Sequence, residues 1–249
     1  MVSALKSKRR SSGDRGSLVW VLAGIAFIVV VVSGSLIAYN MLSSKCSVRD
    51  VEGFSDITIG FDERSSLLPN LSLVALGPER ARYEVYVFYD LYCPFCAWEF
   101  YESLPILLSY ANSGKLKLYM VDTILHGEAR ESHGLLRGSV DFKGAFIKAL
   151  YLSSCRLHVE GKVPDPSYMR GVLSKLNITI PEDRVRVEVA KAQQITRAAL
   201  NLLTSLYGDP RYVGTPTIVV YDVEFREVKA ILPGRVEPGR IDLTLKSLP

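Results

Sequence analysis

The chain has 249 residues, of which 48% are hydrophobic and 22% charged, and its formal net charge is +4. This length accommodates one large domain or two small ones, with enough apolar residues for a real core. Several of the positive charges lie within the first fifteen residues, so the modest excess does not indicate a nucleic-acid-binding surface.

A basic segment precedes a long apolar run near the N-terminus. The run from Leu18 to Ala38 has 21 residues and no charge, and as a helix it would be roughly 32 Å long, enough to cross a bilayer. We predict a cytoplasmic tail over 1–16 and a single transmembrane anchor over 17–40, which the positive-inside rule orients with the remainder outside the cytoplasm. The alternative is a cleaved signal peptide, and both readings place the folded domain outside the cytoplasm.

Four cysteines therefore lie in a compartment where disulfides persist. Only Cys93 and Cys96 have the spacing of a motif. Cys46 and Cys155 form a structural disulfide in one reading, and in the other Cys46 joins two chains near the membrane.

The predicted elements alternate between strands and helices after a stalk over 41–69. A strand–helix–strand unit follows an initial strand, and its helix begins at the cysteine pair. The expected strands cover 71–76, 83–89 and 115–124, and the intervening helix runs from 93 to about 110, with a kink at Pro105.

A long helical region interrupts the strands before the chain returns to β structure. Apolar residues recur at steps of three and four, which predicts an inserted helical subdomain over about 128–208. Its expected helices cover 140–157, 166–176 and 181–207, and they are followed by strands at 217–221 and 227–232 and a closing helix over 238–248.

The most informative motif is Cys93-Pro94-Phe95-Cys96, placed directly after an apolar strand. A cysteine at a helix N-terminus faces free backbone N–H groups, which favour its thiolate and lower its pKa. The thiolate is the form that attacks disulfides, so the motif predicts dithiol–disulfide exchange.

Two segments resemble the DsbA-like thiol:disulfide oxidoreductases: residues 87–96, which contain the cysteine pair, and residues 213–219, which contain a Gly-Thr-Pro sequence. The resemblance implies an α/β, thioredoxin-like domain over 70–249 that carries a helical insertion, preceded here by the transmembrane helix. It also implies exported cysteine-containing proteins as substrates and a membrane redox partner that recycles the dithiol. Neither a cofactor nor a metal is expected.

Each residue of the motif has an expected role. Cys93 is predicted to be the exposed nucleophile, and Cys96, one turn into the helix, the shielded resolving thiol. Pro94 suits the first helical turn because its missing N–H would have no partner there. Phe95 cannot donate a hydrogen bond to the Cys93 thiolate, so we expect a less oxidising couple than in the strongest oxidases.

Three further residues are expected to support the site. Pro216 resembles the family's cis-proline, which would expose the backbone of Thr215 to a substrate peptide; the alternative is a trans proline that opens a strand. Asp90 either assists proton transfer from Cys96 or caps the following helix. Val87 occupies a position that is often acidic in relatives, which argues against a proton relay there.

The three histidines show no paired spacing and are interpreted as surface or structurally satisfied residues.

The sequence predicts a membrane-anchored, extracytoplasmic oxidoreductase that forms disulfides in exported proteins. A reductase or isomerase of the same fold is the first alternative. A non-catalytic metal- or peptide-binding module, with a structural cysteine pair, is the second.

Overall fold

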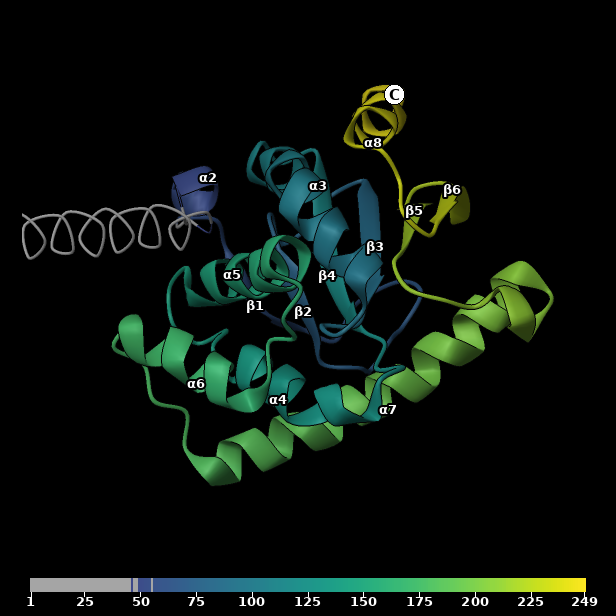
Figure 1. The fold of residues 1–249 in the computed structure, drawn as a ribbon. Helices are drawn as coiled ribbons and strands as arrows, with labels where there is room; N and C mark the ends of the chain where they lie inside the picture. The colour runs from purple at the N-terminus through teal and green to yellow at the C-terminus, as the bar shows by residue number, and fades with distance from the viewer. Residues whose placement is uncertain (1–45, 47–48, 55) are drawn as a thin grey trace, which may run out of the picture. The chain divides into compact units, whose positions relative to one another are not determined.

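The computed structural model describes residues 46, 49–54 and 56–249. Its centre is a six-stranded sheet in the order β1-β2-β4-β3-β5-β6 (Figure 1). The strands are β1 (Ile59–Asp62), β2 (Leu73–Leu76), β3 (Tyr83–Tyr89), β4 (Leu116–Asp122), β5 (Thr217–Asp222) and β6 (Glu227–Pro233).

The central pair, β3 and β4, is parallel, and every other neighbouring pair is antiparallel. Helix α3 (Pro94–Asn112) makes the crossover between the two parallel strands, as predicted for a strand–helix–strand unit. All seven residues of β3 are buried, which fits a strand whose two faces are both covered by helices.

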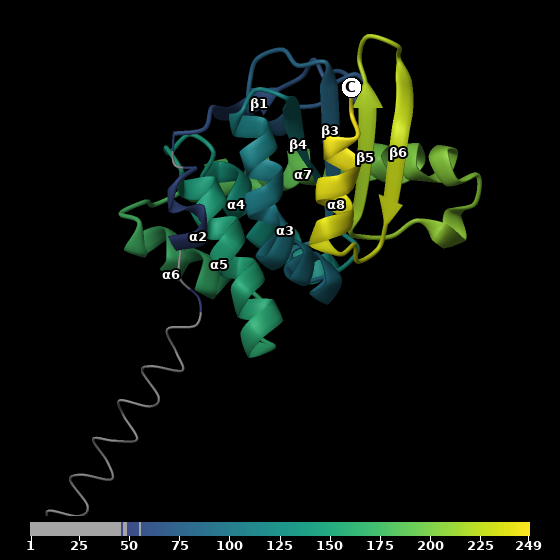
Figure 2. The same ribbon diagram turned by 90° about the horizontal axis from the view of Figure 1, so that it is seen from above.

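Alternate residues of β3 enter two separate cores. Val85 and Val87 pack with the side of the sheet that α3 covers, and Tyr86 and Phe88 pack on the other side with residues of α7 (Glu182–Tyr207). Figure 2 shows α3 and α8 in front of the strands and α7 behind them. The sheet therefore separates two helical layers, as the two-residue period of a strand requires.

The predicted helical insertion is present between β4 and β5. It contains a short 3-10 helix at Gly127–Ala129, a second at Pro210–Tyr212, and the helices α4 (Arg130–Gly138), α5 (Ala145–Glu160), α6 (Pro166–Lys175) and α7. The remaining helices are α2 (Arg49–Glu52) and the closing α8 (Pro238–Lys246).

Two elements differ from the sequence-based predictions. The segment 41–69, predicted to be a stalk, contains β1, which pairs with β2 and closes one edge of the sheet. Ile59 and Phe61 of this strand pack against the core. The helix predicted to begin at Val140 begins at Ala145, and α4 precedes it as a separate helix that the periodicity did not reveal.

Cys46 and Cys155 form a disulfide, with a sulfur–sulfur distance of 1.98 Å. The bond joins the start of the described chain to α5 and decides between the two predicted pairings in favour of the intramolecular one. Within the described residues no helix is long and apolar enough to cross a membrane. The predicted anchor over 17–40 lies outside those residues.

Candidate active site

Strand pairing brings two distant loops to the same end of the sheet. Cys93 lies four residues beyond the end of β3, and Thr215 lies two residues before the start of β5. Because β3 and β5 are antiparallel, with Phe88 opposite Thr217, the end of one strand lies beside the beginning of the other. The cysteine motif and the Gly-Thr-Pro segment are therefore adjacent.

Cys93 is the N-cap residue of α3, and its free thiol lies between two backbone groups. Its sulfur accepts the N–H of Cys96 at 3.5 Å and donates to the carbonyl oxygen of Thr215 at 3.3 Å. The helix begins with Pro94, as expected from its missing N–H. The cysteine side chain thus occupies the capping position that Ser or Asp often fills.

The predicted exposure of Cys93 is wrong, because only 6% of the residue is accessible. The segment around Thr215 covers the sulfur and forms one of its hydrogen bonds. Cys96 is more deeply buried, at 1%. The predicted order of access is therefore retained, although both thiols are more enclosed than the sequence suggests.

The two thiols have opposite shifts in pKa. The hydrogen bond from the Cys96 side chain, together with the Cys96 backbone N–H, lowers the pKa of Cys93 to about 6 against the opposing effect of burial. Burial, and then the interaction with Cys93, raises the pKa of Cys96 well above its ordinary value. At neutral pH this dithiol holds a thiolate at Cys93 and a proton at Cys96.

Phe95, between the two cysteines, is 58% exposed. Its ring presents an apolar surface beside the thiol and has no group that could donate to the Cys93 sulfur. Phe95 therefore lies at the accessible rim of the site.

The peptide bond between Thr215 and Pro216 is cis, as the resemblance implied. Pro216 is buried, and its carbonyl oxygen accepts the N–H of Gly234 at 2.8 Å. This bond connects the Gly-Thr-Pro segment to the loop that leads into α8.

Asp90 does not have the capping role that was one of its two predicted roles. Cys93 caps α3, and the Asp90 carboxylate instead accepts the backbone N–H groups of Tyr92, Leu125 and His126 at 2.9, 2.7 and 2.7 Å. Burial opposes ionisation, but the bonds from the backbone N–H groups of Tyr92 and His126 help to hold the pKa of Asp90 below its ordinary value. A carboxylate held this strongly in its ionised form is a poor proton acceptor.

The backbone of Asp90, not its side chain, contacts the redox pair. Its N–H donates to the sulfur of Cys96 at 3.5 Å, and its carbonyl oxygen accepts the N–H of Cys93 at 3.2 Å. The carboxylate therefore ties the loop after β4 to the loop before α3, and the peptide groups of the same residue hold both cysteines.

Sequence reasoning missed three titratable residues near the site. His126 Nδ1 lies 2.9 Å from the Asp90 carboxylate, and His133 is fully buried on α4 behind Leu91. Glu99, one helical turn beyond Cys96, is 1% exposed. For Glu99 the sequence did hold a signal, an acidic residue on the apolar face of α3. The two histidines gave no signal, because only the fold of the insertion brings them near the site.

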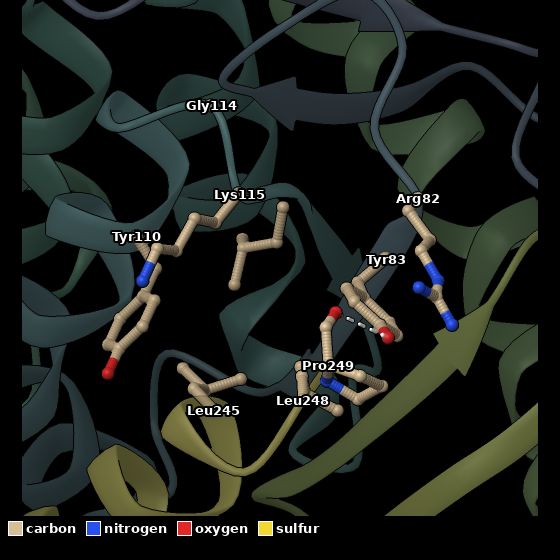
Figure 3. A pocket seen from close by; sticks show the side chains of 9 residues that line it. Arg82, Tyr83, Tyr110, Gly114, Lys115, Leu245, Leu248 and Pro249 are labelled. Carbon is tan, nitrogen blue, oxygen red and sulfur yellow. Dashed lines mark hydrogen bonds between the residues drawn. The ribbon is translucent and has the colours of Figure 1, made fainter.

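A pocket at the opposite end of the central strands is separate from this chemistry (Figure 3). Its lining includes Tyr83 and Leu116, the first residues of β3 and β4, together with Pro249, whose carbonyl oxygen accepts the Tyr83 hydroxyl at 3.1 Å. The lining contains no cysteine. In the part of the chain that the structure describes, no three His, Cys, Asp or Glu side chains are grouped to hold a metal ion.

Comparison with known proteins supports a thioredoxin-like fold for this domain. Residues 70–151, which include the cysteine pair, match the family described as Thioredoxin. A crystal structure of a variant of alpha-DsbA1 from Wolbachia pipientis superposes with a TM-score of 0.57, at 16% identity, over 74% of this chain and 96% of that one. The domain has the DsbA-like thioredoxin fold.

Two further structures share this DsbA-like fold. The catalytic domain of Proteus mirabilis ScsC has a TM-score of 0.51 at 16% identity, and the match covers 74% of this chain and 93% of that one. A thioredoxin-like oxidoreductase from Silicibacter pomeroyi has a TM-score of 0.53 at 16% identity, over 74% and 96% of the two chains. No curated protein sequence matches the chain.

Proposed function

We propose that this DsbA-like domain is a thiol:disulfide oxidoreductase that forms disulfides in exported proteins. The observation that carries the proposal is the asymmetry of the pair. A thiol with a pKa of about 6 at a helix N-terminus adjoins a buried partner that keeps its proton. This is the arrangement that one attacking sulfur and one resolving sulfur require.

The reaction begins with the oxidised pair. A substrate thiolate attacks Cys93, a substrate–Cys93 bond forms, the Cys93–Cys96 bond breaks, and Cys96 leaves as a thiolate that takes up a proton. A second substrate thiol loses its proton and attacks the substrate sulfur of the mixed disulfide, which releases Cys93. The substrate has lost two electrons and the protein is a dithiol, so a membrane redox partner must accept those electrons to restore the disulfide.

We place this domain outside the cytoplasm on a single N-terminal anchor over 17–40. The apolar run and the preceding basic residues support this location. The Cys46–Cys155 disulfide also supports it, since such bonds persist in oxidising compartments.

The direction of exchange is testable from the reduction potential of the Cys93–Cys96 couple. We expect equilibration with glutathione buffers to give a potential more oxidising than about −230 mV, because a stabilised Cys93 thiolate favours the reduced form. A potential near about −270 mV, which is that of thioredoxin, would instead assign the domain to disulfide reduction.

Cysteine variants distinguish an enzyme from a binding module with a structural cysteine pair. Cys93→Ser is expected to abolish catalysis of oxidative refolding, and Cys96→Ser to accumulate mixed disulfides because no resolving thiol remains. If both variants refold a reduced substrate as fast as the unmodified protein, the exchange proposal is wrong.

A further inference from the structure

We infer that His133, on helix α4 of the insertion, is a positioning residue for the Cys93–Cys96 pair, an inference that rests on the proposed exchange function. The hydrogen bonds of the ring go to Leu91 and Asp122, and not to either sulfur. The ring acts through the backbone of the loop between β3 and α3, where residues 90–92 precede the first cysteine.

The two nitrogens of the His133 ring have different partners. Nε2 accepts the backbone N–H of Leu91 at 3.1 Å, and Nδ1 lies 2.7 Å from a carboxylate oxygen of Asp122. Oδ1 of Asp90 lies 3.8 Å from Nε2, too far for a hydrogen bond. Because Leu91 is the donor at Nε2, we assign the ring proton to Nδ1, from which it is donated to Asp122. The ring is fully buried, so no water competes for either bond.

Asp122 is itself held by groups from strand β3 and helix α4. Its carboxylate accepts the hydroxyl of Tyr89 at 3.0 Å and Nη1 of Arg137 at 2.8 Å, and Nε of Arg137 bonds to Glu188 at 3.1 Å. Arg137 lies on α4 and Glu188 on α7, and both are fully buried. A buried network whose members are paired fixes side-chain orientation more firmly than an exposed one.

The bond to Leu91 therefore connects this fixed network to the redox loop. The preceding residue, Asp90, donates its N–H to the sulfur of Cys96 at 3.5 Å and accepts the N–H of Cys93 at 3.2 Å. The Asp90 carboxylate and the Cys93 N–H also hold this loop. Loss of the Leu91 bond removes one of these supports, and we infer that the Asp90 N–H then shifts relative to the Cys96 sulfur.

The consequence falls on the step in which Cys96 leaves. An N–H donated to a sulfur favours its thiolate and lowers its pKa, and a leaving thiol of lower pKa leaves faster. His133 thus supports attack on the Cys93–Cys96 disulfide, although it lies on a helix outside the strand–helix–strand unit that carries the motif.

Two substitutions of His133 in the full chain distinguish a role in positioning the redox loop from a role in core packing alone. His133→Gln can place an amide oxygen near the position of Nε2 and accept from Leu91, whereas His133→Asn reaches only toward Asp122. We expect His133→Asn to slow reduction of the Cys93–Cys96 disulfide by a small thiol on the order of threefold or more. His133→Gln should restore most of the rate. His158→Asn, a change to an exposed histidine, serves as the control.

Equal rates in His133→Asn and the unmodified protein would overturn the inference while leaving the exchange function intact. Equal losses in the Asn and Gln variants, matched by equal losses of melting temperature, would also overturn it. If the Cys93–Cys96 disulfide of the unmodified protein does not react with the small thiol at all, the proposed function fails and the inference falls with it.

A measurement on the unmodified protein decides the question if the Asn variant does not fold. The nitrogen-15 spectrum of His133 at pH 7 should show an unprotonated Nε2, and the Leu91 amide should be protected from hydrogen exchange. A proton on Nε2, or rapid exchange of the Leu91 amide, would contradict the proposed contact.

Discussion

The asymmetry between the two thiols arises from their immediate neighbours. The Cys96 thiol and backbone N–H both stabilise the Cys93 thiolate, and the surrounding core disfavours charge on Cys96. The helix N-terminus contributes through its unpaired N–H groups. A difference in environment, and not in residue type, therefore separates the attacking sulfur from the resolving one.

The first prediction concerns the ionisation of Cys93. The alkylation rate of the dithiol with iodoacetamide should rise with pH with a midpoint near 6, because only the thiolate reacts. Cys96→Ala should move the midpoint upward, since it removes the largest stabilising hydrogen bond, and Cys96→Ser should move it less because a hydroxyl can still donate. A midpoint above about 8 in the unmodified protein would match an unperturbed cysteine.

Glu99 is a buried carboxyl that the proposed reaction does not use. Oε2 accepts the N–H of Val236 at 3.1 Å, and Oε1 has no hydrogen-bond partner among the described residues. Burial raises the pKa of Glu99 to about 7 despite the bond from Val236. The folded protein therefore binds a proton more tightly here than the unfolded chain does.

The second prediction follows from the sign of that shift. The stabilising effect of the proton is present below the unfolded pKa of about 4.5 and is lost as the pH rises to about 7. Glu99→Gln should therefore raise the free energy of unfolding at pH 8 by up to about 3 kcal/mol relative to the unmodified protein, and change it little at pH 4. Urea unfolding at both pH values measures this.

Glu102→Gln provides the matched control for Glu99, since Glu102 lies on the same helix and is exposed. Its effect should be small at both pH values. An equal effect of Glu99→Gln at pH 4 and pH 8 would show that folding does not raise the pKa of Glu99.

At the scale of single residues, the sequence predicts which residues form the motifs but not which side chains and backbone groups contact them. The spacing of Cys93 and Cys96, and the resemblance around Pro216, locate the reacting sulfurs and the facing loop. The contacts of Asp90 were not predictable because its partners at Leu125 and His126 follow β4, and only sheet pairing brings them together.

Close packing joins two helices of the insertion, α4 and α7. A Cβ built at Gly134 on α4 would lie 2.5 Å from a methyl carbon of Val189 and 3.0 Å from the carbonyl oxygen of Val185, both on α7. Only glycine permits this approach without displacement of α7. The contact also holds α4, and with it His133, against the end of β4.

The third prediction tests this helix contact. Gly134→Ala should lower the free energy of unfolding by about 1–3 kcal/mol, because the added methyl group overpacks the interface. Gly171→Ala in α6 is the control: nothing lies within 4 Å of the added carbon, so better helix propensity should leave stability equal or raise it by up to about 1 kcal/mol. Chemical denaturation of both variants compares them, and equal effects would contradict the packing argument.

Elements with strong periodicity are predictable, and short ones are not. The apolar stripe of α7 and the apolar run of β3 predict boundaries that agree with the observed ones to within one residue. Helix α4 has nine residues, of which seven are buried, including a charged Arg137 and two glycines. No simple apolar period can reveal a helix whose buried face is polar and glycine-containing.

At the scale of the whole molecule, a disulfide closes a long loop. The bond between Cys46 and Cys155 spans 109 residues and includes β1 to β4 in the closed segment. A cross-link over such a distance restricts the unfolded chain strongly. Sequence could supply the two cysteines, but their pairing depends on α5 lying near the start of the described chain.

The fourth prediction concerns the loss of this cross-link. Replacement of both Cys46 and Cys155 by Ala should lower the free energy of unfolding by about 2–5 kcal/mol, because the unfolded chain gains conformational freedom. Exchange at Cys93 should continue at a similar rate, since the cross-link is separate from the redox pair. Unchanged stability would show that the bond does not constrain the chain, and abolished exchange in a folded variant would show that it belongs to the site.

The most direct test of the central claim is the identity of the sulfur that reacts. The oxidised full chain, treated briefly with reduced glutathione and quenched in acid, should carry glutathione on Cys93, as read by peptide mass spectrometry. Glutathione found on Cys96 alone, or a Cys93–Cys96 disulfide that does not react while a simple peptide disulfide does, would contradict the account.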